Sequence, residues 1–194
     1  MHTRLAVVAA ALALSSAAFG QDAAPRETVS ASVGGKKVSI EYGRPSLKGR
    51  TLDSLIAQLP KDRIWRAGVD QVTTLTTEGA LTVGDKKVPA GKYSVYVHAT
   101  PEGVWSLVLN TDLGIALIKI WDKAPANLAN EPWPHLEDYS SILAKEVARA
   151  AMKAGTAAPA AEMFTVKLAS AGTGATLTLS WGDKSYSLEL AAAK

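Results

Sequence analysis

The stretch "YSVYVHAT", residues 93–100, decides the fold class, because it alternates in twos and is rich in β-branched and aromatic residues. This composition is typical of a half-buried β-strand. Similar short runs occur at 28–33, 37–42, 72–77, 104–110, 164–169, 175–181 and 185–190. Short strands at such spacing favour an antiparallel sandwich or barrel. We expect a mainly β, single-domain antiparallel β-sandwich, jelly-roll-like in type.

Three glycine-containing segments resemble one another and separate predicted strands. They are "VGGKKV" (33–38), "VGDKKV" (83–88) and "WGDKSY" (181–186). Glycine beside Gly or Asp supplies the positive φ that tight hairpin turns need, and lysine keeps the exposed edge soluble. We interpret them as three similar hairpin turns.

Two segments carry helical signals. Residues 51–59 begin with Thr51 as a candidate N-cap, have Asp53 in the first turn and stop before Pro60, which predicts one short helix near 51–59. The segment "SILAKEVARAAMKAG" (141–155) contains strong helix formers, yet Val147, Arg149 and Ala151 also fit strand alternation. Between these segments, residues 120–139 contain three prolines and no periodicity, which predicts a long irregular loop.

The N-terminus has the three parts of a secretory signal peptide. Arg4 precedes an apolar run, and small residues at Ala18 and Gly20 form a cleavage site. The run is too short for a membrane anchor, which needs roughly 20 apolar residues. We therefore expect cleavage near Gly20 and a periplasmic or secreted product, with a signal at 1–20, a short tail at 21–27, one domain at 28–190 and a C-terminal tail at 191–194. The chain has no cysteine, so it forms no disulfide and no thiolate metal site.

Positive charge is concentrated in one segment. The net charge of +3 is too small for the basic surface that nucleic acid binders usually carry, so we expect no nucleic acid partner. Residues 42–70 contain six basic and three acidic residues. Guanidinium groups suit carboxylate and phosphate, and glycine allows close backbone approach. The candidate ligand-binding residues are Arg44, Lys48, Arg50, Trp65 and Arg66.

A structural role for these residues competes with ligand binding. The loop 43–50 can equally be a corner whose arginines pair with Asp53, Asp62 and Asp70. The aromatic residues of the long loop, Trp121, Trp133 and Tyr139, present the same choice between a sugar-stacking platform and a cluster that pins the loop to the sheet.

The sequence contains few signs of catalysis. His98 fits a strand and His135 a loop, and neither has metal-ligand spacing, so we expect no metal and no cofactor. The chain lacks a nucleophile elbow and a phosphate-binding loop. One carboxylate pair, Asp70 with Glu162, is the candidate for hydrolase chemistry, although Glu162 is better interpreted as a buried partner of an arginine.

Five ordered motifs resemble a known family. They are "YGRPSLKGR" (42–50), "IWRAG" (64–68), "VPAGKYSVYV" (88–97), "WSLVLN" (105–110) and "EMFTV" (162–166). In this order they resemble the bacterial domain of unknown function family numbered 2911. The resemblance implies a secreted, mostly β domain and carries no activity, substrate or catalytic residue. It also implies a strand rather than a helix at 145–153. Where the family pattern tends to read Ala-Asn, this chain has Val69-Asp70, which places a carboxylate near Arg66.

Three functional hypotheses follow. The first is an exported, soluble, non-catalytic module that binds a small anionic or glycan ligand through the basic segment. The second is a cell-envelope hydrolase that uses Asp70 or Glu162 as acid or base. The third is a structural envelope protein that has no small ligand and works through protein contacts.

Overall fold

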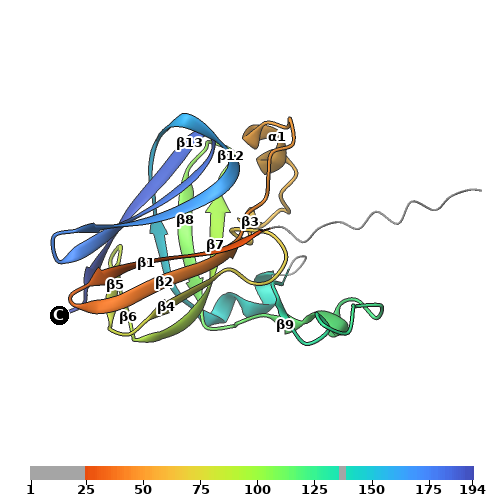
Figure 1. The fold of residues 1–194 in the computed structure, drawn as a ribbon, viewed down its shortest axis with the longest axis horizontal. Helices are drawn as coiled ribbons and strands as arrows, with labels where there is room; N and C mark the ends of the chain where they lie inside the picture. The colour runs from red at the N-terminus through yellow and green to blue at the C-terminus, as the bar shows by residue number, and fades with distance from the viewer. Residues whose placement is uncertain (1–24, 136–138) are drawn as a thin grey trace, which may run out of the picture.

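Figure 1 shows the computed structural model, which describes residues 25–135 and 139–194 as antiparallel sheets packed against each other. One sheet has the order β1-β2-β4-β7-β8-β11, with β3 paired to β7; the other has the order β12-β13-β5-β6. The fold is mainly β with one short α-helix, as the sequence predicts. The strands of the first sheet are β1 (Arg26–Val33), β2 (Lys36–Gly43), β3 (Ile64–Trp65), β4 (Thr74–Thr77), β7 (Gly91–Ala99), β8 (Trp105–Asn110) and β11 (Glu146–Ala151).

The second sheet is built around one long hairpin. Its strands are β12 (Lys153–Ala171), β13 (Gly174–Ala192), β5 (Leu81–Val83) and β6 (Lys86–Val88). A short pair, β9 (Ile115–Ala116) with β10 (Pro132–Trp133), closes an excursion at one end. The signal segment 1–20 lies outside the described residues. The first paired residue of β1 is Arg26, and the last paired residue of β13 is Ala192. The segments 21–27 and 191–194, which were predicted to be tails, therefore both contain strand residues.

Two of the three predicted turns are hairpin turns, and the third is not. The segment at 33–38 joins β1 to β2, and that at 83–88 joins β5 to β6. The segment at 181–186 lies inside the continuous strand β13. Its Gly182 has φ +62°, and the register with β12 shifts opposite it, between Thr156 and Ala161. A β-bulge and a tight turn can both need one residue with a left-handed backbone, which glycine adopts easily. The local sequence therefore predicted a hairpin turn at a position where the strand has a bulge and continues.

The ambiguous segment near 145–153 is a strand, as expected. Strand β11 pairs antiparallel with β8, and it buries Ala148 and Ala150 while Arg149 stays exposed. A 3-10 helix, η2 (Tyr139–Lys145), precedes it. The space beside β8 therefore overrides the helical propensity of this segment.

The α-helix within residues 25–135 and 139–194, α1 (Leu52–Ala57), forms where the capping signals predict it. The Thr51 hydroxyl accepts a hydrogen bond from the Ser54 N–H (3.2 Å), and Asp53 lies in the first turn. Leu52 is buried, and Leu55 and Ile56 pack against the core. In Figure 1 the helix lies at the same end of the sandwich as the β9 excursion, away from the β1–β2 turn.

Aromatic rings fill the core at this end. Trp65 stacks on Trp181 with ring centroids 5.2 Å apart, and it contacts Phe164 edge-on at 4.8 Å. Trp105 stacks on Tyr186 at 4.1 Å. These contacts join β3 and β8 of the first sheet to β12 and β13 of the second, and they support the loops that carry the candidate site.

Candidate functional site

A cavity of about 620 Å³ lies at the helix end of the sandwich, between the loop 44–50 and the excursion 117–133. Arg44, Lys48 and Arg50 line one side. The other side is lined by Leu117, Trp121, Leu128 and Trp133. The structure thus brings the predicted basic loop and two of the predicted loop aromatics to one cavity, although the two segments are far apart in the sequence.

Backbone hydrogen bonds fix the loop 44–50 against β12. Leu47 N–H donates to the Glu162 carbonyl (3.0 Å), and Phe164 N–H donates to the Pro45 carbonyl (2.8 Å). Ser46 and Met163 form an antiparallel bridge between them. The loop is therefore a short addition to the edge of the second sheet.

Gly43 is required by packing. A Cβ at this position would lie 2.2 Å from the Val69 carbonyl oxygen, which is closer than any real contact allows. The segment 66–70 therefore occupies the space that a side chain would take. The close backbone approach that we assigned to a ligand is made by the chain itself.

The first two arginines of the loop are bonded within the protein. Arg44 donates from Nε to the Phe164 carbonyl (3.2 Å) and from Nη2 to Thr165 Oγ1 (3.0 Å), and it forms an ion pair with Glu27 (3.1 Å). Arg50 donates from Nε to the Leu47 carbonyl (2.9 Å). The predicted pairing of these arginines with Asp53, Asp62 and Asp70 is wrong. Arg44 instead forms its ion pair with Glu27 on the neighbouring strand β1. Arg50 donates to a carbonyl of the same loop, three residues before it.

Lys48 differs from these arginines. It has a left-handed backbone (φ +50°), and its side chain lines the cavity. No residue within 25–135 or 139–194 forms a hydrogen bond or an ion pair with its ammonium group. Lys48 is thus a cation at the cavity that the described part of the fold does not use.

Arg66 and Trp65 line a neighbouring cavity of about 320 Å³ together with Arg50 and Trp181. Burial lowers the pKa of Arg66, and the nearby Asp70 carboxylate partly offsets this effect. The placement of a carboxylate near Arg66, which the departure from the family pattern predicted, is therefore observed. Arg50 lines both cavities, so the five candidate residues surround two adjoining spaces.

The aromatic residues of the long loop were predicted either to stack on a sugar or to pin the loop to the sheet, and the structure shows a different arrangement for each of them. Trp121 is 49% exposed at the large cavity, and Trp133 is half-buried in β10. Tyr139 is buried and contacts Tyr96 edge-on, with ring centroids 4.9 Å apart. Tyr139 pins the chain to the sheet, whereas Trp121 presents a ring to the cavity.

The two candidate catalytic carboxylates have different surroundings. Glu162 is exposed and accepts hydrogen bonds from the Ser46 hydroxyl (2.7 Å) and the Lys48 N–H (2.8 Å), which lower its pKa. The interpretation of Glu162 as a buried partner of an arginine is wrong, because it caps the loop backbone instead. Asp70 lines the large cavity and has a left-handed backbone (φ +63°).

The histidines occupy the expected elements. His98 lies in β7 opposite Ile64, and His135 lies 3.2 Å from Asp112 in the loop. Within the part of the chain that the structure describes, no three His, Cys, Asp or Glu side chains are grouped so that they could hold a metal ion. In the same part of the chain, no helix has the length and apolar character needed to cross a membrane.

Comparison with known proteins identifies the family. Residues 24–190 match the family described as protein of unknown function (DUF2911). The chain belongs to this family. The match covers both sheets and every residue that lines the two cavities of this DUF2911 domain. Comparisons with curated proteins and with solved structures gave no match.

Proposed function

We propose that this DUF2911 protein is an exported, non-catalytic module that binds an acidic carbohydrate in the large cavity. The observation that carries the proposal is that Lys48 and Trp121 line the same cavity, with the cation on the loop and the exposed ring on the excursion. The volume of about 620 Å³ lies in the range of small-ligand sites.

The chemistry of the cavity suits a sugar with an acidic group. An indole face packs against the C–H face of a sugar ring, and Trp121 and Trp133 are the rings that line this cavity. A carboxylate, sulfate or phosphate on the sugar would lie near Lys48 and near Arg50, whose Nε and Nη2 donate to loop carbonyls and whose Nη1 makes no hydrogen bond within residues 25–135 and 139–194. Arg44 contributes positive charge, while its hydrogen bonds keep the wall in place.

The contacts of the carboxylates favour binding over hydrolysis. A glycosidase needs two carboxylates that flank one bond, one of them with a raised pKa. Of the described residues that line the large cavity, Asp70 is the one carboxylate. The pKa of Glu162 is lowered, so this side chain stays ionised and is poorly suited to act as an acid.

Calorimetric titration with acidic and neutral oligosaccharides of equal length tests the proposal. We expect the acidic members to bind more tightly, and this preference to shrink with added salt. Trp121→Ala should weaken binding by about 2 kcal/mol, roughly thirtyfold, as expected for a tryptophan that anchors an interface. Lys48→Gln should cost up to about 1 kcal/mol and should flatten the salt dependence.

The matched control is Lys92→Gln, since Lys92 is an exposed lysine of β7 that lines neither cavity. Its affinity should equal that of the wild type. The proposal fails if no acidic oligosaccharide binds, or if acidic and neutral members bind equally well and Lys48→Gln changes nothing.

Export has its own test, because its support is the signal pattern at 1–20 together with the family resemblance, and neither depends on the cavity. Mass spectrometry of the protein isolated from the cell envelope should give a chain that begins at Gln21. An intact chain that begins at Met1 and fractionates with the cytoplasm would contradict export. The binding proposal would not be affected, because the calorimetric titration tests it separately.

A further inference from the structure

The cavity of about 320 Å³ that Arg66 lines (the Arg66 cavity) differs in chemistry from the large cavity beside it. Its charged side chains are two arginines, and none of the described residues that line it has a hydroxyl, amide or carboxylate side chain. Aliphatic and aromatic side chains make up most of the lining, and they include Leu55, Ile56, Leu59, Trp65 and Trp181. The hydroxyl groups of a sugar would lack hydrogen-bond partners on such a wall, so this cavity suits a different class of ligand.

Arg66 is a half-buried cation whose donors the described fold does not use. No residue within 25–135 or 139–194 accepts a hydrogen bond from its guanidinium group or forms an ion pair with it. Burial lowers the pKa of Arg66, because desolvation disfavours the charged form, and the charge of Asp70 acts in the opposite direction. An arginine stays charged in proteins and has five N–H donors. A partly desolvated guanidinium group of this kind is suited to bind an anion.

Trp181 adds a second unpaired donor to the residues that line this cavity. Its side chain is 5% exposed, and its indole Nε1 has no hydrogen-bond partner among the residues that the structure describes. Buried donors are nearly always paired in folded proteins. Two of the lining residues, Arg66 and Trp181, therefore have donors without an acceptor from the described chain.

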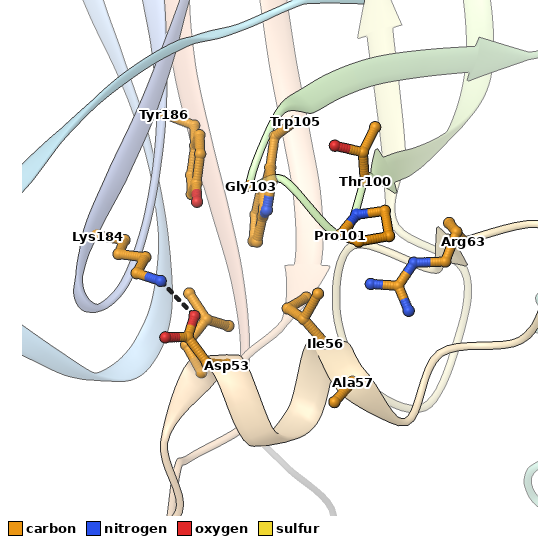
Figure 2. Close-up of a pocket in the computed structure, with 11 residues that line it drawn as sticks. Asp53, Ile56, Ala57, Arg63, Thr100, Pro101, Gly103, Trp105, Lys184 and Tyr186 are labelled. Carbon is orange, nitrogen blue, oxygen red and sulfur yellow. Dashed lines mark hydrogen bonds and ion pairs between the residues drawn. The ribbon is translucent and has the colours of Figure 1, made fainter.

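Figure 2 shows a separate cavity, of about 240 Å³, that borders the same helix, and its cations are bonded within the protein. Lys184 forms an ion pair with Asp53, which Figure 2 marks with a dashed line. Arg63 donates from Nε to the Ala99 carbonyl (3.0 Å). Positive charge at that cavity thus has partners in the chain, whereas the charge of Arg66 is left for a ligand.

We infer that the Arg66 cavity binds a small amphiphilic carboxylate, with the carboxylate group at Arg66 and the apolar body against Trp65 and the residues of α1. The planar fork of a guanidinium group matches a carboxylate through two parallel hydrogen bonds, so one arginine is enough to hold the head group. The body is an aromatic ring or a short acyl chain, because the volume is about 320 Å³ against about 620 Å³ for the large cavity. Binding here does not depend on the carbohydrate proposal, since neither Lys48 nor Trp121 lines this cavity.

Nitrogen-15 spectra of the five indole N–H groups test this inference on the intact chain. The tryptophans report on different cavities: Trp65 and Trp181 line the Arg66 cavity, Trp105 lines the cavity of Figure 2, and Trp121 and Trp133 line the large cavity. Replacement of each tryptophan in turn with phenylalanine assigns the signals. Hexanoate should give saturable shifts of the Trp65 and Trp181 signals and should leave both signals of the large cavity unchanged.

Matched probes identify the chemistry of the ligand. Hexanol and hexylamine keep the carbon chain of hexanoate without its negative charge, and glucuronate keeps the carboxylate on a ring covered with hydroxyl groups. Hexanoate should bind more tightly than all three, and up to about tenfold more tightly than butyrate, because each buried methylene group adds to the affinity. The inference is overturned if hexanoate gives no saturable shift up to tens of millimolar, if hexylamine or glucuronate binds equally well, or if the shifts are confined to Trp121 and Trp133.

Variants locate the head group. Arg66→Gln removes the charge and should weaken hexanoate binding by about tenfold or more, as expected for the loss of charge-assisted hydrogen bonds. Arg66→Lys keeps the charge without the fork and should weaken binding less. The matched control is Arg63→Gln, which removes a positive charge from the cavity of Figure 2 and should bind hexanoate as the wild type does. Equal affinity of the wild type and both Arg66 variants would overturn the assignment, whatever the oligosaccharide titration gives.

Discussion

Replacement of Arg44 with glutamine should destabilise the fold by about 2–3 kcal/mol. The substitution removes the hydrogen bonds to the Phe164 carbonyl and to Thr165 Oγ1, each of which contributes about 1 kcal/mol. It also removes the ion pair with Glu27, in which the side chains are 27% and 40% exposed. Solvent screening limits that pair to about 0.5 kcal/mol. The loss is large because Arg44 ties the end of β2 to β12.

Urea unfolding followed by circular dichroism measures this loss. Lys48→Gln is the matched comparison from the same loop, and it should stay within about 0.5 kcal/mol of the wild type because its ammonium group has no described partner. The slope of the unfolding line should be unchanged in both variants. If Arg44→Gln is as stable as Lys48→Gln, the contacts of Arg44 do not hold the sheets together. The assignment of a structural role to Arg44 and a ligand-binding role to Lys48 would then be wrong.

Two further predictions concern Tyr42. Its hydroxyl donates to Glu27 Oε2 (3.0 Å) and accepts from the Val166 N–H (2.9 Å). Tyr42→Phe leaves this buried N–H without a partner, so it should lower the free energy of unfolding by about 2 kcal/mol in the same assay. An unchanged unfolding midpoint would contradict this prediction. Burial raises the pKa of Tyr42 to about 12, against about 10 in the unfolded chain. The stability that the neutral hydroxyl provides is therefore fully present below about pH 10 and is lost as the pH rises toward 12. Melting temperatures across this range should fall less steeply for Tyr42→Phe, and parallel curves would refute the assignment.

The strands were predictable because their signal is local. Period-two alternation at 93–100 requires no knowledge of the neighbouring strands, and the cap at Thr51 acts within one helical turn. The bulge at Gly182 was not predictable, because a turn and a bulge require the same backbone conformation at one residue and differ only in the register of the partner strand.

The candidate sites were predictable in part. The basic loop and the exposed Trp121 were each recognised, but their meeting at one cavity depends on how the sheets pack. The pairing of Arg44 with Glu27 depends on the β1–β2 register, which places Glu27 opposite Tyr42.

The attachment of the loop 44–50 to β12 has a consequence for protein engineering. Its course is set by main-chain groups of Pro45 and Leu47, which do not depend on the side chains that face the cavity. Position 121 can therefore be randomised, and position 48 can be varied among residues that tolerate its left-handed backbone, such as Gly, Asn and Asp. The resulting library should keep the fold while its members differ in ligand preference. Such a cysteine-free scaffold would also allow a single cysteine to be introduced at position 121 for site-specific labelling.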